Sequence, residues 1–133
     1  MAADGLITVA SAYGPKETMD RLEAAVKAKG LTVFARIDHA AGAAKVGLPL
    51  RPTTVLVFGN AKGGTPLMQA VQTIGIDLPL KALVWQDAAG KTWLSYNDPG
   101  WIAKRHGLGH EVDATIGALT GALRALAQAA TAP

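Results

Sequence analysis

TTVLVFGNAKGGTPLMQ, residues 53–69, is the stretch from which the rest of the chain is interpreted. It begins with the apolar run 55–58, which is typical of a buried strand. A glycine-rich stretch follows, and Thr65 and Pro66 then have the residue types of a helix N-cap and a first helical position. We therefore predict a strand, a glycine-rich turn and a helix. Such a turn presents backbone N–H groups to an anion, or it is only a tight turn.

The composition is that of a folded globular chain. Its 133 residues suffice for a buried core in one domain, which we expect to cover residues 1–133. Half of the residues are hydrophobic and 17% are charged, which excludes an intrinsically disordered protein. The chain has no cysteine, which excludes disulfides, thiolate metal sites and a cysteine nucleophile.

The charge is mildly positive and scattered. The 13 Lys and Arg residues outnumber the acidic ones to give a net charge of +3, but they form no basic stripe, so we expect no nucleic-acid partner. Residues 1–10 lack the pattern of a secretory signal, and no window approaches the roughly 18 apolar residues of a membrane span. We expect a cytoplasmic domain with no membrane partner.

The first part of the chain predicts a strand over 6–13, a helix over 15–29 and a second strand over 31–40. The helix has an apolar stripe at Met19, Leu22, Ala25 and Val26. In the second strand alternate residues share a face. The face toward the helix would carry Leu31, Val33, Ala35, Ile37 and then His39. The opposite face would carry Phe34, Arg36 and Asp38.

The third strand is apolar on both of its faces, because Val55 and Val57 alternate with Leu56 and Phe58. We interpret residues 41–52, before it, as a glycine- and proline-bearing connection. Strands that are apolar on both faces are usually covered on both. One layer of helices covers one side only, so the other side would meet a ligand, a folded-over segment or a second subunit.

The remaining segments complete the fold prediction. A helix over 66–74 precedes two strands, 80–86 and 91–96, joined by a hairpin turn at 87–90. A short helix that Gly107 ends and a long helix over 111–130 follow. The long helix carries an apolar seam at Val112, Ile116, Leu119, Leu123 and Leu126.

The resulting order of elements is β-α-β-β-α-β-β-α-α. It predicts an α/β (α+β) domain, a two-layer sandwich with a mainly antiparallel open sheet of about five strands and helices on one face.

The glycine-rich turn is the first candidate site. Lys62 precedes Gly63 and Gly64, so the turn is not a Walker loop, and the dinucleotide spacing of glycines is also absent. What remains is a helix N-terminus with Lys62 nearby, which suits one carboxylate or phosphate group. The alternative is a turn whose glycines serve only its geometry.

The histidines give weaker signals. His39 fits a hydrogen-bonded core histidine, whereas Asp38, beside Arg36, fits a dimer-interface pair or a ligand clamp. His106 and His110 are four residues apart, but Gly107 and Gly109 interrupt a helix between them. With no third ligand at a suitable spacing, we expect no metal and no other cofactor.

A series of short motifs carries a resemblance to a known family. The motifs run in order along nearly the whole chain: IDHAAGA (37–43), LRPT (50–53), FGN (58–60), GTPLMQ (64–69), DLPLK (77–81), YNDP (96–99) and RHG (105–107). With them the chain resembles the bacterial domain of unknown function family numbered 302. The resemblance implies a compact two-layer α/β domain, often a homodimer, and it implies no activity.

The resemblance also singles out polar positions within these motifs. They are Asp38, His39, Arg51, Thr53, Asn60, Lys62, Thr65, Lys81, Tyr96, Asn97, Asp98 and His106, to which the glycine-rich turn adds Gly64. Most of them fall at predicted strand ends or in loops, where binding residues usually occur. We hypothesise that they converge on one ligand pocket.

Three functions follow from these observations. The preferred one is a non-enzymatic, homodimeric binding or sensing module for a small anionic ligand, with donors from Arg51, Asn60, Lys62 and Lys81. One alternative is a small enzyme that uses His39 or His106 as general acid/base with Asp98 as partner. The other is a structural protein whose apolar sheet face serves to dimerise. The sequence assigns no catalytic residue.

Overall fold

A computed structural model describes residues 3–133 and contains one five-stranded antiparallel sheet. The order of the strands in the sheet is β1-β5-β4-β3-β2, and every neighbouring pair is antiparallel. The strands are β1 (Leu6–Ala10), β2 (Thr32–Asp38), β3 (Thr53–Gly59), β4 (Leu80–Gln86) and β5 (Thr92–Asn97). The predicted α+β class with an open antiparallel sheet is confirmed.

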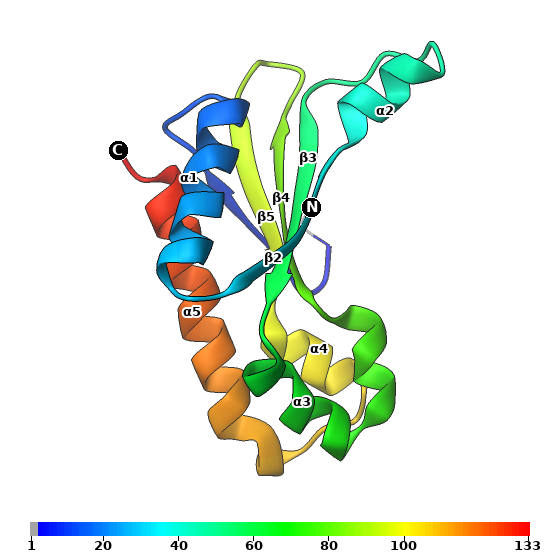
Figure 1. Cartoon of the computed structure of the whole chain (residues 1–133), viewed down its shortest axis with the longest axis vertical. Helices are drawn as coiled ribbons and strands as arrows, with labels where there is room; N and C mark the ends of the chain where they lie inside the picture. The colour runs from blue at the N-terminus through cyan, green and yellow to red at the C-terminus, as the bar shows by residue number, and fades with distance from the viewer. Residues whose placement is uncertain (1–2) are drawn as a thin grey trace.

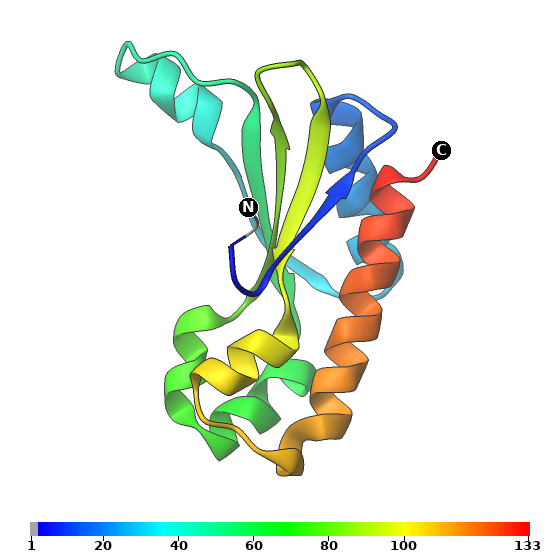
Figure 2. The same cartoon turned by 180° about the vertical axis from the view of Figure 1, so that it is seen from behind.

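The helices occupy three places around the sheet. They are α1 (Pro15–Ala28), α2 (His39–Lys45), α3 (Ala61–Ala70), α4 (Pro99–Arg105) and α5 (Asp113–Thr131), with the short 3-10 helices η1 (Gln72–Asp77) and η2 (His110–Val112). Helices α1 and α5 lie side by side along one face of the sheet (Figure 1). Helices α3 and α4 form a lobe at one end of the sheet, while α2 projects at the other end (Figures 1 and 2).

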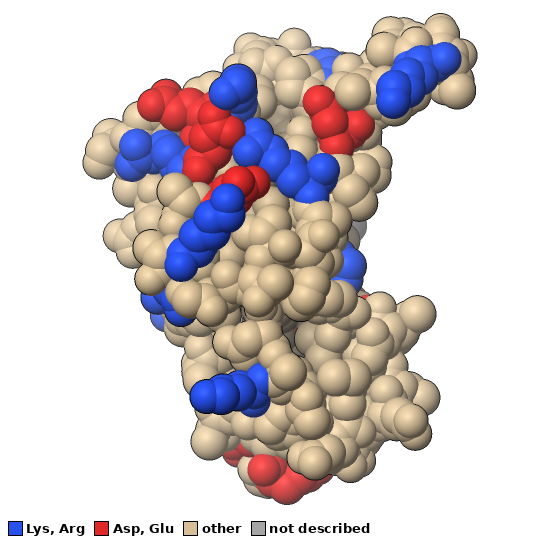
Figure 3. Space-filling model, viewed as in Figure 1, with Lys and Arg blue, Asp and Glu red and all other residues tan. Residues whose placement is uncertain are grey.

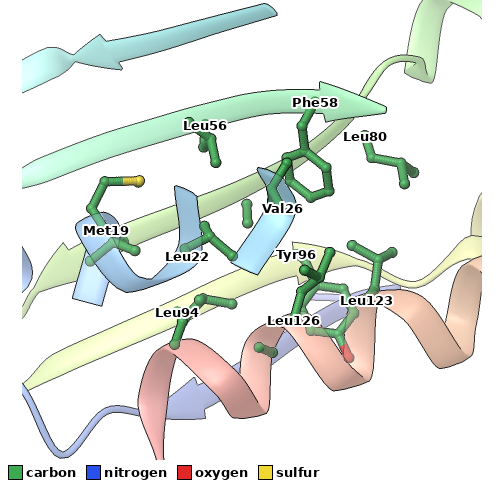
Figure 4. Close-up of a cluster of buried hydrophobic side chains, with 14 residues drawn as sticks. Met19, Leu22, Val26, Leu56, Phe58, Leu80, Leu94, Tyr96, Leu123 and Leu126 are labelled. Carbon is green, nitrogen blue, oxygen red and sulfur yellow. The ribbon is translucent and has the colours of Figure 1, made fainter. Parts of the chain in front are cut away.

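The main core lies between the sheet and the helix pair α1 and α5. Figure 4 shows Leu22 and Val26 of α1 and Leu126 of α5 pointing toward Leu56 and Phe58 of β3 and their neighbours. The predicted stripe of α1 is confirmed, since its residues Met19, Leu22 and Val26 are buried.

The predicted seam of α5 connects this core to a second one in the lobe. Leu123 and Leu126 belong to the main core, Ile116 packs in the lobe, and Leu119 packs against both. Since one helix carries both contacts, α5 holds the lobe against the end of the sheet.

A β-bulge in β2 changes the faces that alternation predicts. The register shifts between Val33 and Ala35, so that Arg36 pairs with Leu56 and Ile37 with Val55. Arg36 therefore lies on the helix side, where its guanidinium forms ion pairs with Asp20 and Glu23 of α1. The predicted placement of Ile37 toward the helices and of Arg36 away from them was wrong, because an inserted residue reverses the alternation that follows it.

The connection predicted at 41–52 contains a helix. Strand β2 ends at Asp38, whose carboxylate accepts a hydrogen bond of 2.9 Å from the backbone N–H of Ala41 and so caps α2. Alanine-rich HAAGAAK has high helix propensity, which the glycine at 42 lowers without abolishing. His39 is consequently an exposed first residue of α2, and the prediction of a core histidine at the end of a strand was wrong.

Helix α3 begins earlier than predicted. Its N-cap is Asn60, whose Oδ1 accepts a 2.7 Å hydrogen bond from the N–H of Gly63, so the predicted cap at Thr65 was wrong. The glycines at 63 and 64 are helical, and Pro66 lies inside the helix. The predicted helix over 66–74 in fact ends at Ala70, and η1 covers the residues that follow. Asparagine is at least as favourable as threonine at an N-cap, so Asn60 can begin the helix as well as Thr65 can.

The sheet face away from α1 and α5 carries a partly exposed apolar patch at its centre, with polar residues such as Thr8 and Lys81 around it. Val55, Val57, Leu83, Trp85 and Trp93 are half-buried on this face, with the two indoles stacked at 6.2 Å. We call this surface the open face. Among residues 3–133 no helix is long and apolar enough to cross a membrane.

Candidate functional site

A cavity of about 590 Å³ lies where the sheet meets the lobe. Its walls come from the start of α3, the middle of α5, the bulged end of β2, and the segment that leads from η1 into β4. Figure 3 shows the molecule narrowed and hollowed at this level, where Figure 1 places the start of α3 beside α5. We call it the waist cavity.

The walls of the waist cavity are mostly hydrocarbon. Large apolar side chains come from separate elements, namely Leu31, Phe34, Leu78, Leu80, Leu119 and Leu126. Phe34 sits at the bulge of β2 and is 55% exposed, unlike the buried Leu80 and Leu126. A bulge re-aims the side chain it carries, and here it presents an aromatic ring to the cavity.

The polar groups of the waist cavity all come from the first turn and a half of α3 and its cap. They are Asn60, Lys62 and Thr65, and Lys62 is the single charged residue in the lining. The first N–H groups of a helix have no acceptor within it, and Asn60 Oδ1 satisfies only that of Gly63. The positive end of the helix dipole and the Lys62 ammonium therefore make this side of the cavity electropositive.

Four of the predicted site residues therefore line the waist cavity, namely Asn60, Lys62, Gly64 and Thr65. Gly64 lies beside the segment before β4, where a Cβ would make an ordinary van der Waals contact of 3.5 Å with Leu78 Cδ1.

A second group of predicted residues lies at the other end of β2 and β3. Asp38 caps α2, and His39 is exposed beside it. The Nε of Arg51 donates to the carbonyl of Gln86 at 3.3 Å, and Thr53 Oγ1 donates to the carbonyl of Arg51 at 2.9 Å. These contacts fix the loop before β3, and they are separated from the waist cavity by the length of a strand.

The remaining residues have separate structural surroundings. Lys81 Nζ donates to the carbonyl of Pro79, and Tyr96 is buried in the main core, where burial raises the pKa of its phenol. Asn97 is exposed at the end of β5. Asp98 caps α4 by accepting a 3.2 Å hydrogen bond from the N–H of Gly100. The hypothesis that all these side chains converge on one pocket was therefore wrong.

His106 belongs to a cluster that the sequence did not reveal. Its Nε2 lies 2.6 Å from Asp77 Oδ2 and its Nδ1 lies 3.1 Å from Thr73 Oγ1. Arg105 adds an ion pair of 2.9 Å to the same carboxylate. The predicted partnership of His106 with Asp98 was wrong, because Asp98 is engaged at its own helix cap.

The pKa of the Asp77 carboxyl lies below its ordinary value. Burial by itself would raise this pKa, but the hydrogen bond from His106 and the positive charge of Arg105 together outweigh it. The cluster joins η1 to the C-terminal end of α4 just before Leu78, a wall residue of the waist cavity. Its geometry is that of a clamp which positions this wall, and His106 does not line the cavity itself.

Sequence reasoning missed Asp77 and the apolar half of the waist cavity for different reasons. Asp77 was part of a quoted motif, but its partners lie 28 and 29 residues further along the chain. Leu31, Leu119 and Leu126 have the spacing of core residues, and nothing in a periodic pattern separates a cavity wall from a filled core. The position of Phe34 in the cavity wall depends on the β-bulge in β2, which no local sequence pattern predicts.

The fold and the waist cavity define a small two-layer α+β domain with a largely apolar cavity beside a helix N-terminus. The chain belongs to the family described as "Domain of unknown function DUF302", whose model matches residues 7–126. A solved relative, the uncharacterized conserved protein DUF302 from Bacillus stearothermophilus, has the same fold. It superposes with a TM-score of 0.85 at 22% identity, covering 96% of this chain and 99% of that one.

Curated relatives from Brucella are similar at the level of sequence. "Fluoride-specific ion channel FluC 1" of Brucella suis biovar 1 (strain 1330) is 50% identical over 115 residues, which are 86% of this chain and 45% of the relative. "Fluoride-specific ion channel FluC 2" of Brucella melitensis biotype 1 is also 50% identical over 115 residues, 43% of its length. The chain therefore spans less than half the length of these relatives.

Proposed function

We propose that the chain is a homodimeric binding or sensing module for a small anionic ligand, and that the waist cavity is its binding site. The observation that carries the proposal is the cavity itself. Its volume of about 590 Å³ falls within the range of roughly 300–1,000 Å³ that is usual for small-molecule sites.

The preference for an anion comes from the charges around the waist cavity. Lys62 supplies a full positive charge and the start of α3 supplies backbone N–H groups. The lining contains no Asp or Glu that would repel a carboxylate or phosphate. The other donors expected from the sequence, Arg51 and Lys81, are bonded elsewhere and have no part in this proposal.

Native mass spectrometry of the untagged protein, with a denatured control, tests the proposal directly. We expect a mass increment that disappears on denaturation. Ala122→Trp, which fills the waist cavity from α5, would abolish the increment, whereas Ala125→Trp, on the exposed side of the same helix, would retain it. Retention of the increment in Ala122→Trp would assign the ligand to another site.

The names of the Brucella relatives make fluoride the first inorganic anion to test. A fluoride ion would occupy only a small part of the waist cavity and would leave its apolar walls without contact. We therefore expect fluoride neither to stabilise the protein against heat nor to displace the native ligand. Fluoride protection that Lys62→Met removes would reverse this expectation.

The homodimer is supported by the open face. Its strands are five to seven residues long, so at about 3.3 Å per residue and 4.8 Å between strands the face measures roughly 20 by 20 Å. The end of α2 and the loop after it carry three further exposed apolar residues, Val46, Leu48 and Leu50. The face alone, about 400 Å² from these dimensions, is half of the about 800 Å² per partner that a stable interface buries, so a second copy would have to cover neighbouring surface as well.

A further inference from the structure

The polarity of the waist cavity is divided between its two sides. Of its lining residues only Asn60, Lys62 and Thr65 are polar, and all three lie at the start of α3. The remaining lining is apolar or small: α3 adds Met68 and small residues, and the large hydrocarbon side chains opposite come from the start of β2, the segment into β4, and α5. A ligand that fills the cavity therefore meets a cation at one side and hydrocarbon at the other.

This division excludes highly polar ligands. A sugar phosphate or a tricarboxylate would bring hydroxyls or extra charges against Leu119 and Leu126, which have no polar atom to receive them. Polar groups buried without partners weaken binding strongly, and uncompensated charges weaken it more. Lys62 provides for one negative charge.

The volume of the waist cavity sets the size of the apolar part. With about 30 Å³ for each water-sized atom, 590 Å³ holds roughly twenty non-hydrogen atoms. The exposed ring of Phe34 and the half-buried Leu31 and Leu78 provide contact surface for methylene groups. The volume admits a medium-length hydrocarbon chain together with its head group, and the apolar surface suits such a chain.

We propose that the ligand class of the waist cavity is an amphipathic monocarboxylate, with its carboxylate at Lys62 and a medium-length hydrocarbon body against β2 and α5. This inference rests on the proposed function, because it names the ligand of the same site. The carboxylate would accept charge-assisted hydrogen bonds from the Lys62 ammonium, and the apolar body would contribute most of the affinity through buried area.

Calorimetric titration with four probes tests this class. The probes are decanoate, decanol, citrate and inorganic phosphate, with the first two kept below the concentrations at which they aggregate. We expect decanoate to bind the wild-type protein at least tenfold more tightly than decanol, and citrate and phosphate to show no binding. The hydrocarbon chain is common to decanoate and decanol, so their difference isolates the carboxylate.

Two variants assign the carboxylate to its partner. Lys62→Met should reduce the affinity for decanoate to that for decanol and leave decanol binding unchanged. Lys45→Met, on exposed α2 at the far end of the sheet, is the matched control and should bind both probes as the wild type does. Lys62 is exposed, so its replacement leaves the core intact, and an unchanged melting temperature checks this.

The outcomes separate this inference from the proposed function. Binding of citrate or phosphate without decanoate, lost in Lys62→Met, would overturn the amphipathic class and leave an anion-binding module standing. Equal affinities for decanoate and decanol would overturn the role of the carboxylate. No binding of any probe, together with no releasable mass in the purified protein, would overturn both.

Discussion

At the scale of single residues, Gly5 and Gly30 have the same backbone conformation in different surroundings. Both have φ of +75°, in the left-handed region that favours glycine. A Cβ on Gly30 would meet nothing within 4 Å, whereas one on Gly5 would lie 2.3 Å from the indole of Trp101. Gly5 is therefore required both by the turn before β1 and by the packing of α4 against it.

The pair provides a matched test of this packing. Gly30→Ala should lower the free energy of unfolding by about 1 kcal/mol through backbone strain alone. Gly5→Ala should lower it by about 2–5 kcal/mol, because the displaced Trp101 adds an overpacking cost. Urea denaturation of both variants measures the difference. Equal losses would mean that the indole moves aside without cost.

The Asp77 cluster predicts a pH dependence of stability. The pKa of Asp77 is lower in the folded protein than its unfolded value of about 4, because the His106 hydrogen bond and the Arg105 charge outweigh burial. A carboxyl with a depressed folded pKa contributes stability above the unfolded pKa, and this contribution is lost as the pH falls through the folded pKa.

Asp77→Asn should therefore be less stable than the wild type by about 1–2 kcal/mol at neutral pH, with the gap closing as the pH falls below the unfolded pKa and through the lower folded pKa of Asp77. Thermal melts at a series of pH values measure the gap. Asp4→Asn, an exposed carboxylate outside the cluster, is the control and should show no comparable gap. A gap for Asp77→Asn that persists in acid would point to lost packing instead of a lost charge.

At the scale of elements, the start of α3 combines a structural role with the binding role that we propose for it. The Asn60 side chain caps the helix through Gly63, and it also lines the waist cavity. A helix cap is worth about 0.5–2 kcal/mol, and aspartate caps as well as asparagine does. A negative charge at residue 60 should preserve the cap but repel an anionic ligand, so one substitution can separate the two roles.

Asn60→Ala should cost about 1 kcal/mol of stability, because the N–H of Gly63 loses its acceptor. Asn60→Asp should retain the stability, since a carboxylate is a favourable cap, but it should weaken decanoate binding through repulsion between like charges. Urea denaturation and calorimetry measure the two effects. Undiminished decanoate affinity in Asn60→Asp would place the carboxylate of the ligand away from α3.

At the scale of the whole molecule, the open face predicts self-association. Leu83 lies in the middle of this face, paired with Val55 on one side and Ser95 on the other. We expect the wild-type protein to be a dimer by size-exclusion chromatography with light scattering, and Leu83→Glu to be a monomer. Ile76→Glu, at a 74% exposed position in the lobe, should remain dimeric. A monomeric wild type at micromolar concentration would contradict the proposed dimer.

The sequence by itself determined the elements whose patterns are local. Hydrophobic periodicity predicts the apolar stripe of α1, the apolar seam of α5 and the class of the sheet. Turn residues predict the hairpin between β4 and β5. Both signals arise between neighbours in the chain. The glycine-rich segment lines the waist cavity, and its helix begins five residues before the predicted Pro66.

Only the tertiary structure decided which of these pieces meet. The bulge in β2, the pairing of Asp77 with His106 and the joining of Leu31, Leu78 and Leu119 around one cavity are contacts between distant segments. The free energy of these contacts depends on packing in three dimensions. Secondary-structure propensity and hydrophobic periodicity describe neighbours in the chain, so they do not predict such contacts. Apolar residues that line a cavity and apolar residues that fill a core have the same pattern in sequence, so only the fold shows which of them line the waist cavity.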